Sequence, residues 1–109
     1  MDEYQTVARV DDIPERGSQS FAVNGRMVAV FRQGETFYAV QDACPHMGAS
    51  LVGGELDDTA VMCPWHAWRF CVKEGTWLDN PRSKLRLERY PVRVQNGEIQ
   101  VAVPATLPE

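Results

Sequence analysis

The feature that most restricts the fold of this chain is a series of short apolar segments that alternate with polar residues and are separated by turn residues. Alternation with a period of two is typical of β-strands, and helical periodicity is almost absent. The pairs Asn24-Gly25 and Asn96-Gly97 are typical of two-residue hairpin turns, because both residue types tolerate positive φ angles. We therefore predict an all-β fold, with strands at residues 4–10, 20–23, 27–31, 36–40, 60–63, 69–72, 90–94 and 98–103.

Local predictions also follow for the segments between these strands. Asp12 and Glu15 have the spacing of a capping box, so we expect a short capped turn that Gly17 closes. Further turns are expected at residues 33–35 and at Glu74-Gly75. The stretch 41–58 is rich in Gly and Asp and is expected to be a loop with a short strand near its end.

The size and charge of the chain exclude several classes of protein. Its 109 residues suggest one domain over residues 1–109, with a core that needs no disulfides. A net charge of -4 and a pI near 5.1 argue against nucleic-acid binding, and we expect the eleven Lys and Arg residues to form no cluster. The sequence shows no apolar run long enough to span a bilayer and no signal-peptide pattern at its start. We therefore expect a cytoplasmic protein without a nucleic-acid or membrane partner.

Two matching segments contain both histidines of the chain and two of its three cysteines. The first is CPHMGASL at residues 44–51, and the second is CPWHAWRF at residues 63–70. Each lies in a predicted loop at the end of a strand and offers one thiolate and one imidazole. An odd number of cysteines in a reducing compartment favours a metal or redox role over a disulfide framework. If the loops converge, one site is formed by Cys44, His46, Cys63 and His66.

Three interpretations of these four residues are open. They could be two structural cysteines and two surface histidines that lie close by accident, although the placement of all the histidine in paired motifs argues against this. They could bind a structural zinc ion, since Cys₂His₂ suits tetrahedral Zn²⁺, but zinc fingers usually run Cys-Cys then His-His. They could hold a Rieske [2Fe-2S] cluster, in which two thiolates bind one iron and two imidazoles bind the other. A loop that contacts both irons needs a Cys and a His close together, which C-x-H and C-x-x-H provide.

On these motifs, the chain resembles the soluble Rieske-type ferredoxins over nearly its whole length. The resemblance extends to the NPRSKL loop and to the closing YPVRV and GEIQV segments. It implies an all-β Rieske iron-sulfur fold of stacked antiparallel sheets, with the cluster-binding loops at one tip. It also implies one [2Fe-2S] cluster per chain, with Cys44 and Cys63 on the inner iron and His46 and His66 on the outer iron.

Further positions place the chain within that family. Pro81 matches a proline that shields the cluster in the family. The high-potential Rieske proteins of respiratory membranes carry an extra cysteine in each cluster loop, where this chain has Ala49 and Trp65. They also carry hydroxyl donors two and four residues after the second histidine, where this chain has Trp68 and Phe70. The resemblance therefore indicates the soluble, low-potential branch.

Other conspicuous side chains have more ordinary interpretations. Cys71 lies outside both loops, and we expect a packed thiol without a ligand role. Phe37 and Trp77 are core candidates. Leu51 is expected either to cover the cluster or to pack within its loop.

The resemblance implies an electron carrier and not an enzyme. A Rieske cluster binds no substrate, and we find no dinucleotide fingerprint, phosphate-binding loop or paired nucleophile and base. The expected role is the ferredoxin component of a multicomponent aromatic-ring oxygenase, a monomer when free, with a flavoprotein NAD(P)H reductase and a terminal oxygenase as partners. The alternative is the small subunit of an NAD(P)H-dependent assimilatory nitrite reductase, bound to a large subunit, because residues 77–82 and 90–101 also resemble that family. A zinc-binding interaction module is a further alternative.

Overall fold

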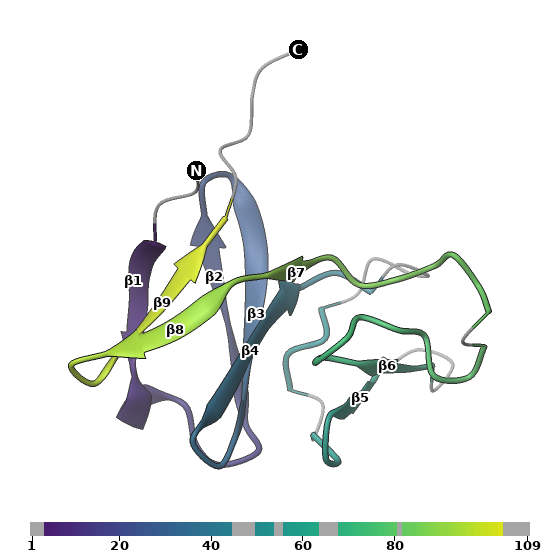
Figure 1. Ribbon diagram of the computed structural model, residues 1–109, viewed down its shortest axis with the longest axis horizontal. Helices are drawn as coiled ribbons and strands as arrows, with labels where there is room; N and C mark the ends of the chain where they lie inside the picture. Colours follow the sequence, from purple (N-terminus) through teal and green to yellow (C-terminus); the bar gives the residue numbers. More distant parts are fainter. Residues whose placement is uncertain (1–3, 45–49, 54–55, 64–67, 81, 104–109) are drawn as a thin grey trace.

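The computed structural model describes residues 4–44, 50–53, 56–63, 68–80 and 82–103 (Figure 1). The described part is almost entirely β-structure, with a short 3-10 helix, η1 (Val10–Asp12). Its strands are β1 (Tyr4–Arg9), β2 (Ser18–Val23), β3 (Arg26–Gln33), β4 (Thr36–Gln41), β5 (Ala60–Met62), β6 (Arg69–Cys71), β7 (Arg89–Tyr90), β8 (Val92–Gln95) and β9 (Glu98–Ala102). Within these residues, no helix has the length and apolar character that a membrane crossing requires. The prediction of an all-β fold is confirmed.

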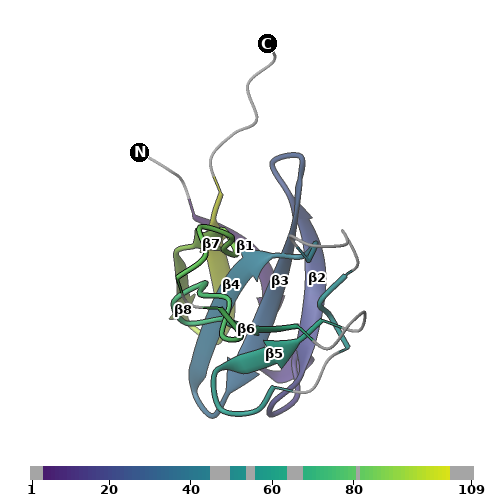
Figure 2. The ribbon, with the colours of Figure 1, turned by 90° about the vertical axis from the view of Figure 1, so that its right-hand side faces the viewer.

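The described strands form three antiparallel sheets. The central sheet has the order β2-β3-β4-β7, the second has the order β1-β9-β8, and the third contains β5 and β6. In Figures 1 and 2, the β5–β6 sheet lies on one side of the molecule and the β1–β9–β8 sheet on the other. Both motif cysteines pack in the core that the central sheet shares with the β5–β6 sheet.

Both Asn-Gly hairpins form as predicted. The φ angles are 50° and 81° at Asn24 and Gly25, and 53° and 76° at Asn96 and Gly97. The expected strand at residues 90–94 is instead divided at Pro91, so that β7 pairs with β4 while β8 pairs with β9. Proline has no N–H to donate to a strand ladder, and the chain changes sheet at this point.

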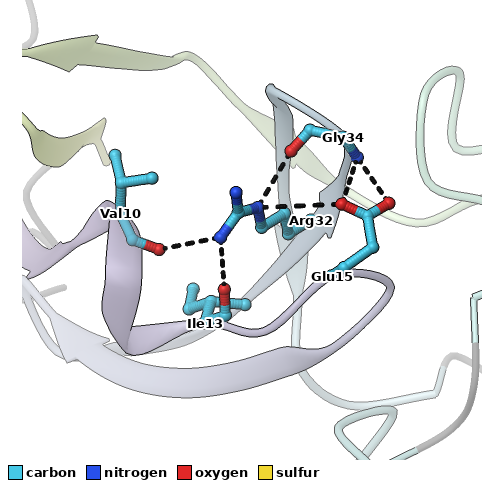
Figure 3. Close-up of polar contacts among 5 residues, drawn as sticks. All are labelled: Val10, Ile13, Glu15, Arg32 and Gly34. Atoms are coloured by element: carbon cyan, nitrogen blue, oxygen red, sulfur yellow. Dashed lines mark hydrogen bonds and ion pairs between the residues drawn. The ribbon is translucent and has the colours of Figure 1, made fainter.

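The predicted capping box between Asp12 and Glu15 is wrong. Asp12 instead accepts a hydrogen bond from the backbone N–H of Arg9 (2.9 Å), the residue just before η1. Its carboxylate therefore caps the start of this short helix. Both Glu15 carboxylate oxygens accept from the backbone N–H of Gly34, at 2.8 and 2.9 Å (Figure 3). A contact across the fold therefore replaces the local one that the spacing predicts.

Arg32 completes this contact between the N-terminal segment and the central sheet (Figure 3). Its guanidinium donates to the carbonyl oxygens of Val10 (3.2 Å) and Ile13 (2.9 Å). The same side chain donates to the carbonyl of Gly34 (2.9 Å), and its Nε lies 4.0 Å from the carboxylate of Glu15. One β3 side chain thus fixes η1 and the β3–β4 turn together.

The loop at residues 41–58 contains isolated bridges where a short strand was expected. In its described residues, Ala43 pairs with Ser50, and Asp57 pairs with Ala60 through two backbone hydrogen bonds of 2.9 Å. The prediction of a strand near the end of this loop is therefore wrong for the described part. A tight turn directly before β5 satisfies these backbone groups instead.

Strand β3 is buried on both faces. All four residues from 28 to 31 are fully buried. Val28 and Val30 belong to a core shared with Ile99 of β9, whereas Ala29 and Phe31 belong to a second core shared with the β5–β6 sheet. The central sheet is therefore the middle of three layers, which explains the uninterrupted apolar run of this strand.

A substitution at Gly75 tests how closely the turn after β6 packs against the segment before β7. Its φ is +79°, and a Cβ at this position would lie 2.6 Å from the carbonyl oxygen of Leu87. We expect Gly75→Ala to lower the free energy of unfolding by more than about 2 kcal/mol, because a left-handed backbone costs an alanine about 1 to 2 kcal/mol and the contact adds to it.

The matched control is Gly34→Ala, because Gly34 is also left-handed (φ +61°) but has open space around the new Cβ. This variant should lower the free energy of unfolding by only about 1 kcal/mol. Denaturation in guanidinium chloride measures both variants, and equal losses would contradict the packing argument.

Candidate metal centre

Cys44 lies just beyond β4, at the start of the first motif segment. Its side chain is only 1% exposed. The backbone N–H of Leu51 donates to the carbonyl oxygen of Asp42 (2.8 Å), and Ala43 forms a bridge with Ser50. The two ends of the first loop are therefore held together beside the cysteine. His46 lies outside the described residues.

The side chain of Asp42 reinforces this closure. It is 9% exposed and accepts a hydrogen bond from the Ser50 hydroxyl (2.7 Å). The Ser50 Oγ in turn accepts from the backbone N–H of Val52 (3.2 Å). A nearly buried carboxylate bonded in this way holds the end of the loop in one position, because breaking the bond would leave a charge poorly solvated.

Cys63 occupies the corresponding place in the second motif segment, directly after β5. It is fully buried, and its backbone N–H donates to the carbonyl oxygen of Trp68 (2.6 Å). One step further back, Met62 pairs with Arg69 across the β5–β6 ladder. The second loop is thus also closed at its base. His66 lies outside the described residues.

The two cysteines share one apolar environment. Cys44 and Cys63 belong to the same core cluster, together with Leu51, Leu56 and Phe70. All three described cysteines are buried thiols outside disulfides. Thiolate sulfur is the inner-iron donor that a Rieske cluster requires, so the described half of the predicted donor set fits this cofactor. Within the described residues, which omit both histidines, no three His, Cys, Asp or Glu side chains gather into a metal site.

The other conspicuous side chains of the sequence can now be compared with their expected roles. Cys71 is 8% exposed, and its thiol donates to the Thr59 hydroxyl (3.4 Å), as expected of a packed thiol. Phe37 is buried, whereas Trp77 is partly buried and stacks on Trp68 with ring centroids 4.0 Å apart. Leu51 is fully buried in the cysteine core. Both tryptophans pack against the cysteine core.

A third segment is fixed to the same region through β6. The backbone N–H of Leu78 donates to the carbonyl of Arg69 (2.8 Å). The Asp79 carboxylate accepts from the backbone N–H of Arg69 (2.8 Å) and from its guanidinium Nε (3.2 Å) and Nη2 (3.1 Å). The Arg69 backbone N–H, helped by the guanidinium, holds the pKa of the Asp79 carboxyl below its usual value. This contact places the chain just before Pro81, which itself lies outside the described residues.

The comparison with known families identifies this arrangement. The family model for the Rieske [2Fe-2S] domain matches residues 3–103. The chain belongs to the Rieske [2Fe-2S] domain family. The fold predicted from the motifs is therefore confirmed, and this family implies a [2Fe-2S] cluster at the site.

Relatives of this Rieske protein include both kinds of protein expected from the sequence. The chain is 40% identical to the 3-phenylpropionate/cinnamic acid dioxygenase ferredoxin subunit of Shigella flexneri serotype 5b, over 91% of this chain and 92% of the relative. A chain of the complex of reduced oxygenase and oxidized ferredoxin in carbazole 1,9a-dioxygenase superposes with a TM-score of 0.81 at 31% identity, covering 99% and 100%. The putative NADH-dependent nitrite reductase small subunit of Mycobacterium tuberculosis gives a TM-score of 0.86 at 28% identity, covering 97% and 99%.

Sequence patterns miss the residues that close the loops of this Rieske domain. Asp42, Ser50 and Asp79 are single polar residues whose partners lie eight or ten positions away. Only their positions could have pointed to them in the sequence, because Asp42 comes just before Cys44 and Ser50 lies inside the first motif segment. Their hydrogen bonds become visible only when the β-ladders bring the loop ends together.

The Asp79 contact predicts a pH dependence of stability. A folded-state pKa below the unfolded value means that the ionised carboxylate stabilises the fold above about pH 4 and that this contribution disappears as the pH falls through the folded-state pKa. We therefore expect Asp79→Asn to lower the free energy of unfolding by up to about 1 kcal/mol, because both side chains are partly exposed.

The loss in Asp79→Asn should be constant between about pH 5 and pH 8, where the carboxylate stays ionised, and should shrink only below about pH 4. Chemical denaturation at several pH values measures it. Asp11→Asn is the control, because Asp11 is exposed. Equal stability of the two variants at pH 7 would contradict the assigned contact.

Proposed function

We propose that this protein carries one electron on a Rieske [2Fe-2S] cluster as the ferredoxin component of an aromatic-ring oxygenase. In this proposal Cys44 and Cys63 bind one iron, and His46 and His66 bind the other. The observation that supports it is the burial of both thiols in one apolar core, each at the closed base of a loop that contains one of the two histidines. Each loop can then supply one ligand to each iron.

The residues around the thiols would hold and shield the cluster. When bound, the cluster supplies a one-electron redox couple. Leu51 and Phe70 exclude water on the core side, because both are fully buried beside the cysteines. Phe70 also stands where the high-potential branch has a hydroxyl donor, which supports a low potential suited to electrons from NAD(P)H.

The partners follow from the role. A flavoprotein NAD(P)H reductase would supply the electron and a terminal oxygenase would accept it, as the carbazole 1,9a-dioxygenase complex of oxygenase and ferredoxin suggests. The protein would be a cytoplasmic, single-domain monomer that performs no catalysis itself. The small subunit of an assimilatory nitrite reductase is the second candidate, because a relative with that name shares the fold over 97% of this chain.

The ligand assignment predicts which cysteines the cluster needs. We expect two irons and two acid-labile sulfides per chain, with Cys44→Ser and Cys63→Ser each abolishing the cluster and greatly lowering stability, because metal binding is linked to folding. Metal analysis, visible spectra and EPR measure this. Cys71→Ser is the control and should keep both the iron and the spectrum, because Cys71 bonds to Thr59 instead. A colourless protein with one zinc would contradict the assignment.

Electron transfer distinguishes the two candidate functions. Protein reduced chemically under anaerobic conditions is mixed either with the oxygenase component of 3-phenylpropionate/cinnamic acid dioxygenase or with the large subunit of an NADH-dependent nitrite reductase. We expect rapid reoxidation of this protein, measured as the return of the visible absorbance of its oxidised cluster, with the oxygenase only, because the ferredoxin of the former system is 40% identical to this chain. Transfer only to the nitrite reductase subunit would reverse the choice, and transfer to neither would refute the proposed role.

A further inference from the structure

Charge is distributed very unevenly along this chain. Residues 69–93 contain seven of the eleven Lys and Arg residues and only three acidic ones, a formal charge of +4. The remainder has four basic and twelve acidic residues, a formal charge of -8. The expectation that Lys and Arg form no cluster is therefore wrong, because the overall charge of -4 conceals a basic segment.

The centre of this segment presents its charges to solvent. From Arg82 to Leu87, exposed residues alternate with less exposed ones, and the exposed positions are Arg82, Lys84 and Arg86. We call these three residues the basic stripe. Within the described residues none of them forms an ion pair; the ion pairs there belong to Arg26, Arg32 and Arg69. The stripe therefore keeps its charge available for a ligand or partner.

The basic stripe lies in the segment that connects β6 to β7. In Figure 1, the segment between β6 and β7 runs along the outside of the β5–β6 sheet. Backbone hydrogen bonds from Asn80 to Trp77 (3.2 Å) and from Ser83 to Asn80 (3.0 Å) form turns within it. Its end is tied to the turn after β6, because the Leu87 N–H donates to the Gly75 carbonyl (2.9 Å). At its far end, Arg86 forms a bridge with Thr76. The stripe is thus held by the same turns that follow β6.

An exposed apolar row lies next to the start of the stripe. Met62 is 49% exposed and Leu78 is 37% exposed. Both lie opposite Arg69, Met62 through the β5–β6 ladder and Leu78 through a backbone hydrogen bond to the Arg69 carbonyl. The Arg69 guanidinium is already paired with Asp79. Met62 and Leu78 are therefore apolar neighbours on either side of Arg69, whose charge is neutralised by Asp79.

We propose that the basic stripe and the Met62–Leu78 row form a docking surface for an acidic patch on the terminal oxygenase that accepts the electron. This rests on the proposed function, which requires a partner to approach the cysteine loops. An apolar contact bordered by complementary charges is the usual composition of a protein interface. The opposite charges of the two parts of the chain would also orient the protein as it approaches an acidic patch.

A protein partner fits these charges better than a nucleic acid or an anionic membrane. Both of those are extended negative surfaces, and the remaining residues of the chain, with a formal charge of -8, would be repelled by them. A protein can confine its acidic residues to a patch that meets the stripe alone. The exposed apolar side chains Met62 and Leu78 also have no use in contacts to phosphate groups.

Two charge-reversal variants test the proposal at equal net charge. Lys84→Glu alters the stripe, and Arg9→Glu is the control, because Arg9 is exposed on β1 and lies outside the basic segment. Stopped-flow measurement follows electron transfer from each reduced holo-protein to the oxygenase component of 3-phenylpropionate/cinnamic acid dioxygenase. At low salt we expect the stripe variant to be roughly tenfold slower than the control, and high salt should remove this difference.

A competition experiment on the unaltered protein does not depend on how the variants fold. Hexaglutamate should slow its electron transfer to the same oxygenase at low salt, whereas hexaglutamine should not. Equal rates for both variants, or no effect of hexaglutamate, would overturn the docking surface. If the unaltered protein still transfers its electron normally in that case, the proposed function stands. Absence of transfer by the unaltered protein would overturn both.

Discussion

The burial of the central sheet on both faces is the constraint on which the rest of the structure depends. Alternate residues of β3 enter two different cores, one shared with β9 and one shared with the β5–β6 sheet and both cysteines. A one-residue shift of this strand would exchange its two apolar faces and move Phe31 out of the cysteine core. The register of β3 against β2 and β4 therefore also determines the surroundings of Cys44 and Cys63.

The second principle of the molecule is that functional loops are closed at their bases. Cys44 and Cys63 each lie next to a short backbone hydrogen bond, from Leu51 to Asp42 and from Cys63 to Trp68. Closure places each thiol at the edge of regular structure, where neighbouring side chains restrict its position. In the proposed role as cluster ligands, thiols held in this way need little further ordering when the metal binds.

Asymmetry of charge connects this scaffold to the proposed role. The basic segment at residues 69–93 has a formal charge of +4 and the remaining residues have -8, so the protein can be oriented by the electric field of a charged partner. The basic stripe is tied to the turn after β6 by the bridge between Arg86 and Thr76, so these three charges and the cysteine core belong to the same side of the fold. An electron carrier benefits from this arrangement, because the charges that orient it toward a partner also bring the proposed cluster site close to that partner.

The sequence by itself determined the all-β class, the two Asn-Gly hairpins and the pairing of Cys-His motifs that led to the Rieske family, because period-two alternation, turn chemistry and donor spacing are local properties. The metal-ligand roles of His46 and His66 stay predictions. Only the tertiary structure decided that Glu15 contacts Gly34, that Pro91 divides one expected strand between two sheets, and that Asp79 fixes the segment before Pro81 to β6. Each of these depends on which strands become neighbours, and that is set by burial of the central sheet on both faces and not by residues close in sequence.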